Sequence, residues 1–352
     1  MTIDLHPPQE IVHIVERRIP NITITQSNLL WQGVAQTSCK PGSLCQTQDG
    51  TILAVWYGGQ EFSGDEHEET ALWLARYKDG AWGKPECIYS EKGHHIWNPV
   101  LFTMPSGKVK INFRKFRPLV PEPQKEKFGV REFIYQTLES HDNGLSWTNL
   151  ETLPYGFTGA AKAAPYIVDD KTWLIPSVKD GKARIEYTND GGTTWQILGP
   201  ILREDGTSNM SEPCIVPAED GTYHIFLRNR QTMSASRYVM LANFNSKTLE
   251  ISPAIQTNIP NPDAGIDVIK LQNGRLLMAA NPSFTDRSSL VLYRSHDDGK
   301  TWETALVLED ENGEFAQASV LQANDGRVHI LYYYWLKDMP DKNIKHVVVK
   351  FA

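Results

Sequence analysis

Short apolar runs separated by tight turns recur six times along the chain. In the segment VIKLQNGRLLMAA, for example, two apolar runs flank Asn273-Gly274. Such a turn between apolar runs is a strong signal for a β-hairpin, because glycine tolerates the positive φ that tight turns require. The other five turns are similar and stand at Asp49-Gly50, Ser106-Gly107, Asp169-Asp170, Asp220-Gly221 and Asp325-Gly326. Each unit therefore predicts an antiparallel strand pair.

The spacing of these turns predicts the architecture. Successive turns lie about 50 to 63 residues apart, which leaves room for four strands in each unit, the size of one propeller blade. Six such units predict an all-β fold, a six-bladed β-propeller.

A second repeat falls between the hairpins and reads Ser/Thr-x-Asp-x-Gly-x-Ser/Thr-Trp. It occurs in full three times, at 140–147, 188–195 and 295–302. The Asp and hydroxyl side chains can hydrogen-bond the backbone of the turn, the glycine takes the positive φ, and the tryptophan packs under the sheet. Residues 77–82 form a shortened copy and 243–249 a degenerate one. We interpret these boxes as folding devices.

Composition and charge narrow the classes of protein. The 352 residues, 40% hydrophobic and 22% charged, suit one large all-β domain or two ordinary ones. No linker or low-complexity tract divides the chain, so we expect a single domain over residues 1–352. The net charge of -7 argues against nucleic acid or an anionic membrane as the main partner, because both require basic patches.

The first twenty residues contain no apolar signal-peptide core, and no run reaches the length of a membrane span. A soluble, cytoplasmic protein is therefore expected. The four cysteines, Cys39, Cys45, Cys87 and Cys214, lack CxxC spacing and are too few for a disulfide framework, which favours buried free thiols.

Three full boxes in a chain of six hairpin units resemble the Asp-box repeats of the sialidase (neuraminidase) superfamily, and in particular a bacterial sialidase-like branch. The resemblance spans almost the whole chain. It implies that an N-terminal strand, expected at 11–19, closes the ring with strands near 344–351. It also implies a sugar pocket on the propeller axis, with three arginines that bind a carboxylate, an Asp acid and a Tyr nucleophile assisted by a Glu.

Two carboxylates match the catalytic roles that the resemblance implies. The segment Gly64-Asp65-Glu66-His67-Glu68-Glu69 is similar to the Asp-Glu-His loop of animal sialidases, which makes Asp65 the expected general acid. A solvated acidic loop is the alternative, and Glu61, Glu66, His67 and Glu69 are the other candidates in it. Glu212, in Ser211-Glu212-Pro213, opens the fourth unit and is expected beside the axis.

The resemblance also implies a basic clamp for the carboxylate. Arg228 follows the Asp220-Gly221 hairpin, Arg230 on the same face could substitute for it, and Arg287 precedes the strand that leads into the third full box. For the first arginine, Arg18 stands in the familiar string Arg-Ile-Pro but in the wrong place. Lys40 enters the first hairpin at the proper distance, and we favour it. A lysine keeps the charge but loses planar recognition.

The last unit departs from the family pattern. Gln317 stands where the tyrosine nucleophile is expected, and neither it nor Phe315 can attack an anomeric carbon. Double displacement through that tyrosine is therefore in doubt. Tyr332, Tyr333 and Tyr334 follow the hairpin, and two core rings with one exposed ring is the ordinary interpretation of such a run.

Further candidates for the pocket lie on the inner strands of the other units. Trp97 could stack on a sugar face and Asn98 could bond a hydroxyl. The remaining candidates are His94, His95, Lys115, Lys162 and Asp267. The histidines do not have metal-ligand spacing with a carboxylate, so neither a metal nor a cofactor is expected.

Three functions fit these residues. The first is an exo-acting glycosidase on a terminal, acidic, α-linked sugar, with Asp65 as acid, Lys40, Arg228 and Arg287 as clamp, and Glu212 orienting or activating water. The second is a lyase on uronic-acid polysaccharides, with His95 or a tyrosine as base. The third is a carbohydrate-binding propeller without catalysis. A shared fold alone does not decide among them.

Overall fold

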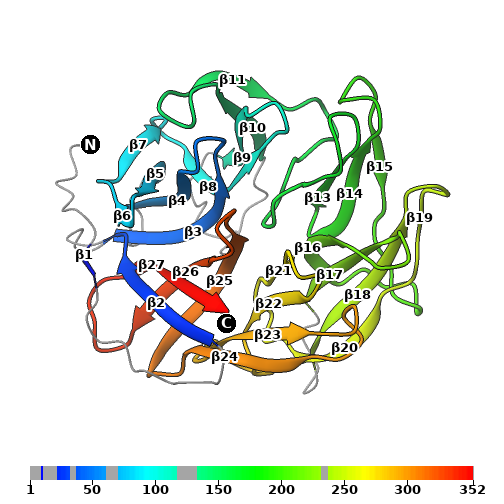
Figure 1. Ribbon diagram of the computed structural model, residues 1–352. Coiled ribbons are helices and arrows are strands. Elements are labelled where there is room, and N and C mark those ends of the chain that lie inside the picture. Colours follow the sequence, from blue (N-terminus) through cyan, green and yellow to red (C-terminus); the bar gives the residue numbers. More distant parts are fainter. Residues whose placement is uncertain are drawn as a thin grey trace, which may run out of the picture.

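The computed structural model describes residues 9–10, 22–31, 37–60, 70–116, 133–230 and 237–351. Their strands form six antiparallel sheets, which Figure 1 shows arranged as a ring around a common axis. The predicted six-bladed β-propeller is confirmed.

The first three blades follow the chain from the inner strand outward. Blade 1 contains β3 (Thr37–Gln46), β4 (Ile52–Gln60), β5 (Thr70–Lys78) and β6 (Ala81–Trp82), with β7 (Glu86–Tyr89) also paired to β5. Blade 2 contains β8 (His95–Thr103), β9 (Val109–Phe116), β10 (Ile134–Ser140) and β11 (Thr148–Thr152). Blade 3 contains β12 (Tyr166–Ile167), β13 (Trp173–Lys179), β14 (Lys182–Thr188) and β15 (Gln196–Leu198).

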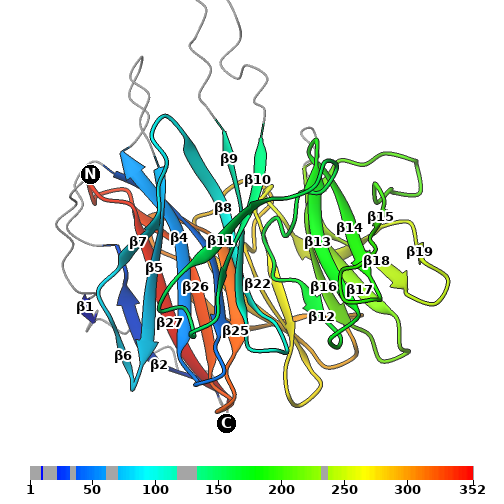
Figure 2. The ribbon, with the colours of Figure 1, turned by 90° about the horizontal axis from the view of Figure 1, so that it is seen from above.

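The next two blades repeat the plan. Blade 4 contains β16 (Met210–Pro217), β17 (Tyr223–Asn229), β18 (Tyr238–Asn245) and β19 (Glu250–Ile251), with β20 (Ile255–Pro260) also paired to β18. Blade 5 contains β21 (Asp267–Lys270), β22 (Leu276–Ala280), β23 (Leu290–Ser295) and β24 (Glu303–Glu309). In each of the six blades, the predicted turn joins the two innermost strands. These strands run alongside the axis in Figure 2.

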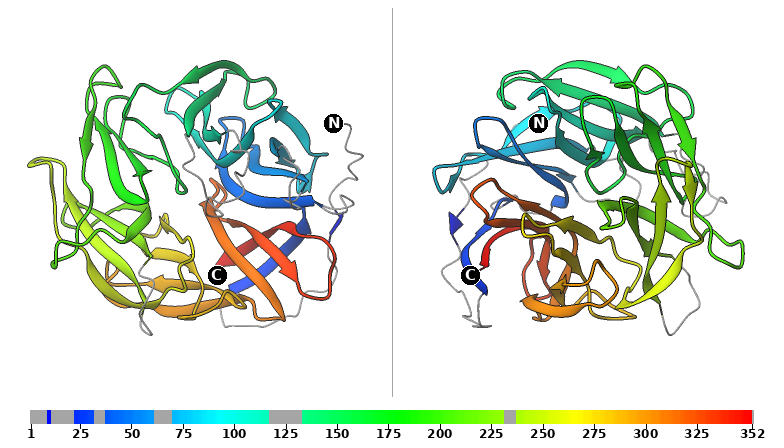
Figure 3. Two further views of the ribbon diagram at one scale, coloured as in Figure 1. Left: turned by 180° about the vertical axis from the view of Figure 1, so that it is seen from behind. Right: turned by 45° about the vertical axis from the view of Figure 1, so that its right-hand side comes forward.

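Blade 6 combines both ends of the chain. It contains β25 (Gly313–Gln322), β26 (Val328–Leu336), β27 (Asn343–Phe351), β2 (Ile22–Leu29) and β1 (Gln9–Glu10). The blue strand β2 lies beside the red strand β27 in Figures 1 and 3. The strand that pairs with β27 is thus 22–29, whereas we expected 11–19. Residues 11–19 lie outside the described residues.

The boxes connect the third and fourth strands of their blades, on the outer side of the ring. In the box at 295–302, the Asp297 carboxylate accepts hydrogen bonds from the backbone N–H of Thr301 at 2.9 Å and from its hydroxyl at 2.6 Å. Gly299 has a φ of +83°, and its carbonyl accepts a bond from the buried Trp302 indole. These contacts agree with a folding role for the boxes and place them away from the axis.

Apolar side chains fill the space between neighbouring blades. One core cluster joins Leu277 and Leu292 of blade 5 to Ile330 of blade 6, and another joins Trp56 of blade 1 to Leu331 of blade 6. This packing of sheet on sheet holds the inner strands at fixed positions around the axis. The cysteines are free thiols, and they are buried except for Cys87, which is exposed.

Candidate functional site

β-bulges turn three side chains toward the axis. The ladder between the two innermost strands shifts register near Asn98 in blade 2, Glu212 in blade 4 and Gln317 in blade 6. These residues have φ values of +48°, +49° and +58°, which are unusual for residues other than glycine. Each stands nine positions before the glycine of its hairpin. A bulge at one repeated position re-aims a side chain, so three blades direct a polar group to one place.

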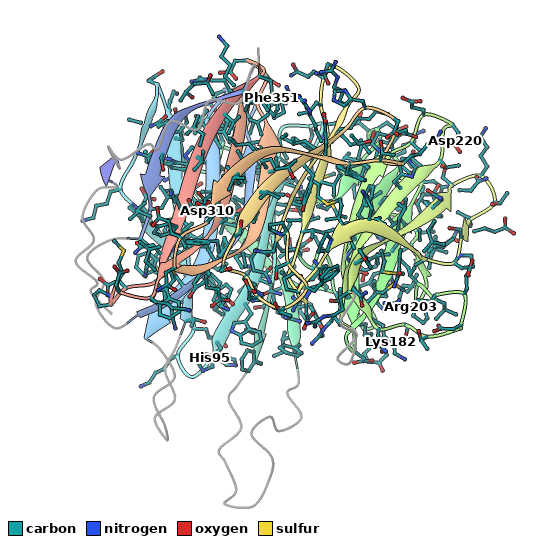
Figure 4. The ribbon with its side chains drawn as sticks, turned by 90° about the horizontal axis from the view of Figure 1, so that it is seen from below. His95, Lys182, Arg203, Asp220, Asp310 and Phe351 are labelled. Atoms are coloured by element: carbon teal, nitrogen blue, oxygen red, sulfur yellow. The ribbon has the colours of Figure 1, made fainter. Side chains whose placement is uncertain are left out.

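These bulges border an axial cavity of about 270 Å³. Eight of the residues proposed from the sequence line it: Lys40, Trp97, Asn98, Lys162, Glu212, Arg228, Arg287 and Gln317. The bulges lie near the starts of the inner strands, at the end opposite their hairpin turns. Figure 4 shows this polarity, with His95 at the start of β8 at one end of the molecule and Asp220 at the other.

Two carboxylates hold Arg228 in place. Its Nη1 donates to Glu212 Oε1 at 2.9 Å, and its Nε donates to Asp263 Oδ1 at 2.8 Å. Burial by itself would lower the pKa of the guanidinium, but the two carboxylates outweigh it and raise the pKa above its ordinary value. Arg228 therefore stays charged and has a fixed orientation.

Arg287 and Lys40 complete the predicted clamp. Arg287 donates to Glu314 Oε1 at 3.2 Å and to the Asp263 carbonyl at 2.7 Å, so Asp263 contacts both arginines. The Lys40 ammonium lies 5.3 Å from the centre of the Tyr333 ring. Burial lowers its pKa, and the nearby Glu314 opposes that shift. The structure brings the three cations to one cavity, and their role in binding a carboxylate stays a prediction.

Glu212 and Gln317 meet above Gly265. A Cβ atom on Gly265 would lie 2.4 Å from Gln317 Oε1 and 2.7 Å from Glu212 Oε2, so a larger residue here would push the ends of both side chains aside. Glu212 Oε2 is buried and has no hydrogen-bond partner among the described residues. An amide thus stands beside this carboxylate, at the position where the resemblance implied a phenol.

Sequence reasoning missed Tyr57 and Arg114, which also line the cavity. We named Lys115 instead of Arg114, but its side chain points away from the cavity and pairs with Glu91. The repeat could have identified both residues, because Tyr57, Arg114 and Arg228 each follow the glycine of their hairpin by seven positions. Burial raises the pKa of the Tyr57 hydroxyl, which stays protonated at neutral pH.

The tyrosine run has one ring near the site. Tyr333 is seven positions after Gly326 and lies against Lys40. Tyr332 and Tyr334 face the other side of β26, where Tyr332 donates to the buried Glu309 carboxylate. All three rings are largely buried, so the expected exposed ring is not seen.

Asp267 and His95 do not line the axial cavity. Asp267 lines a different cavity, of about 520 Å³, and accepts a bond from the Val320 N–H at 2.7 Å. It is the first residue of β21, two positions after Gly265. His95 does not line the axial cavity and stacks on Phe116 at 5.2 Å. Asp65 and its neighbours at 61–69 lie outside the described residues.

The cavity is electropositive. Among the described residues, five cations line it, and Glu212 is the one carboxylate in that lining. The cations are Lys40, Arg114, Lys162, Arg228 and Arg287. Clefts lined by one sign of charge attract ligands of the opposite sign, so the site suits an anion.

No group of three His, Cys, Asp or Glu side chains in the described ranges is placed to hold a metal ion. In the same ranges, no helix has the length and apolar character needed to cross a bilayer.

Comparison with known proteins places this geometry in a family. Residues 50–330 match the BNR repeat-like domain, and no curated protein matches the chain. Among solved structures, a Dyadobacter fermentans protein of unknown function is 16% identical, with a TM-score of 0.77 over 95% of this chain and 100% of that one. The NanB sialidase of Streptococcus pneumoniae is 10% identical, with a TM-score of 0.65 over 88% and 68%.

The intramolecular trans-sialidase of Ruminococcus gnavus, solved with oseltamivir carboxylate, is 13% identical, with a TM-score of 0.63 over 88% of this chain and 93% of that one. Identities this low show a shared fold. The family match covers most of the chain. It begins at Gly50, in the first hairpin turn, and contains the other five turns in full. The chain belongs to the BNR repeat-like domain family, within the sialidase-like Asp-box superfamily.

Proposed function

We propose that this protein is an exo-acting glycoside hydrolase that removes a terminal, acidic, α-linked sugar. The observation that carries the proposal is the convergence of Lys40, Arg228 and Arg287 on one axial cavity that also contains Glu212. A guanidinium fork matches a carboxylate, and a concave site with a few convergent polar groups suits a small ligand such as a sugar.

The replacement of the tyrosine favours direct attack by water. Gln317 cannot form a glycosyl intermediate, so Glu212 is assigned as the base that deprotonates water, with the Gln317 amide as a second hydrogen-bonding group. Asp65 is assigned as the acid that protonates the leaving oxygen. Inverting glycosidases use this division of labour, with carboxyl groups about 6.5 to 9.5 Å apart that leave room for water.

Chromogenic glycosides test the proposal. A panel of sialosides, related ulosonides and uronides should include one that the intact protein hydrolyses. Asp65→Asn and Glu212→Gln should each lower kcat by about 10²- to 10⁴-fold, the usual contribution of a positioned acid or base. Glu219→Gln, which removes an exposed carboxylate near a hairpin turn, is the matched control and should leave kcat unchanged.

Gln317 also favours a second candidate, a propeller that binds acidic sugars without cleaving them. That function predicts saturable binding of a sugar from the same panel with no release of chromophore. A sugar that binds, resists hydrolysis and loses affinity on Arg228→Gln would select this candidate over the hydrolase.

A further inference from the structure

Blade 2 repeats the geometry of blade 4 with a different charge balance. In blade 4, Arg228 on the second strand is neutralised by the bulge residue Glu212. In blade 2, Arg114 occupies the same position relative to the hairpin glycine, but the bulge residue is the neutral Asn98. The guanidinium in blade 2 therefore has no carboxylate from its own bulge.

No other described carboxylate replaces it. Arg228 is paired with Glu212 and Asp263, and Arg287 with Glu314, whereas Arg114 forms no ion pair within the described part of the chain. Its Nε atom is buried and has no hydrogen-bond partner among the same residues. Arg114 is half-buried, and a cation partly withdrawn from water without a counter-ion loses hydration that the charge of a ligand can replace.

Aromatic rings hold this guanidinium in position. It lies 4.6 Å from the centre of the Phe133 ring and 5.6 Å from that of Trp97. Stacking of this kind orients the guanidinium plane and excludes water from its faces. A small alcove of about 20 Å³ adjoins the main cavity here, and its polar lining comprises Arg114, Asn98, Tyr135 and Thr158. No carboxylate borders the alcove in the described ranges.

We propose that the axial site recognises a glycan with a second oxyanion, a sulfate ester or a second carboxylate, which Arg114 binds at the mouth of this alcove. The inference rests on the proposed function, because the first anionic group is assigned to the clamp of Lys40, Arg228 and Arg287. Arg114 lines both the cavity and the alcove, so its terminal N–H groups can reach two oxygens of one group, the bidentate contact that distinguishes arginine. The substrate class is then a doubly anionic sugar terminus.

Matched sugars test this inference by isothermal titration calorimetry at fixed ionic strength. Glucuronic acid has one charge, glucuronic acid 2-sulfate adds a sulfate, and digalacturonic acid has two carboxylates, so the two doubly charged ligands separate the possible sources of the second oxyanion. At least one doubly charged ligand should bind about tenfold tighter than glucuronic acid. Arg114→Gln should abolish this difference, and Arg114→Lys should reduce it.

Two controls separate the contact from net charge. Arg294→Gln removes the same charge from β23, where Arg294 pairs with Glu303, and should leave the difference intact. Arg287→Gln should weaken singly and doubly charged ligands alike. Circular dichroism and melting temperature establish that each variant is folded.

The outcomes distinguish the two proposals. Hydrolysis of acidic glycosides without any preference for a second charge would overturn the role of Arg114 and leave the hydrolase standing. A preference that depends on Arg114, without hydrolysis, would support the second-oxyanion site and count against catalysis. Equal affinity for all three sugars, or binding of none, would overturn the inference.

Discussion

Acid should weaken the seam between blades 1 and 6, because two buried histidines there depend on being neutral. The Trp82 indole of blade 1 donates to His346 Nδ1 at 3.0 Å, and His346 Nε2 lies 3.0 Å from His329 Nδ1. An indole N–H can only donate, so His346 has its hydrogen on Nε2 and donates it to His329. A proton added to either accepting nitrogen breaks a hydrogen bond.

The pKa values give the magnitude. Burial lowers the pKa of His329 from 6.5 to about 4, with Arg327 adding to the shift and Asp325 opposing it. His329 therefore takes up a proton near pH 6.5 in the unfolded chain but only near pH 4 in the folded chain. Stability is full above pH 6.5 and falls as the pH drops between these values. At 1.36 kcal/mol per pH unit, His329 alone should cost about 2 kcal/mol between pH 7 and pH 5.

Urea unfolding at pH 7 and pH 5 measures this loss. In His329→Gln an amide oxygen can accept the bond from His346 without titrating, so the free energy lost between the two pH values should shrink by about 2 kcal/mol. His141→Gln removes a largely exposed histidine and is the control. The Asp142 and Asp297 carboxylates of the boxes have a pKa of about 2 and titrate below this window.

An equal loss of stability in the intact protein and in His329→Gln would refute the reasoning. It would mean that the histidine pair does not resist protonation, or that it is already protonated in the folded chain at pH 7.

Three further outcomes are expected. Gly265→Ala should lower kcat/KM at least about tenfold, because the new Cβ displaces the oxygens of both Glu212 and Gln317; unchanged kinetics would show that their positions are unimportant. Arg228→Lys should raise KM by about 10- to 100-fold, since an ammonium cannot make the two directed bonds to Glu212 and Asp263, and Michaelis curves measure it. Asp297→Ala should lower the melting temperature without changing kcat/KM, because its box lies on the outer strands; a loss of activity in the folded variant would contradict that separation.

The repeat was readable from sequence because its determinants are local. An Asp-Gly turn and a box with Asp297 and Gly299 fix their own backbone through bonds that span two to four residues. The same offsets within each unit place Glu212 and Gln317 at bulges and Arg228 on the neighbouring strand. Arg114 and Tyr57 obey the same offsets and could have been found by applying them to every blade.

The closing strand was misplaced for a physical reason. Five of the eight residues at 22–29 are polar, and its exposed positions include Thr23 and Thr25, so its apolar signal is weak beside that of 11–19. What identifies it is pairing with β27, more than three hundred residues away. No local pattern contains that information.

The six hairpins, the boxes and most of the residues that line the axial cavity could be predicted from the amino-acid sequence, because turn chemistry and repeat spacing act over a few positions. Which of those side chains meet depends on how the blades pack in the folded protein. Asp263 accepts hydrogen bonds from both Arg228 and Arg287. Gly265 leaves space in which the side chains of Glu212 and Gln317 lie close together. Arg114 forms no ion pair with a carboxylate among the described residues. These contacts arise where different blades converge on one axis, and their partners are set by the closure of the ring.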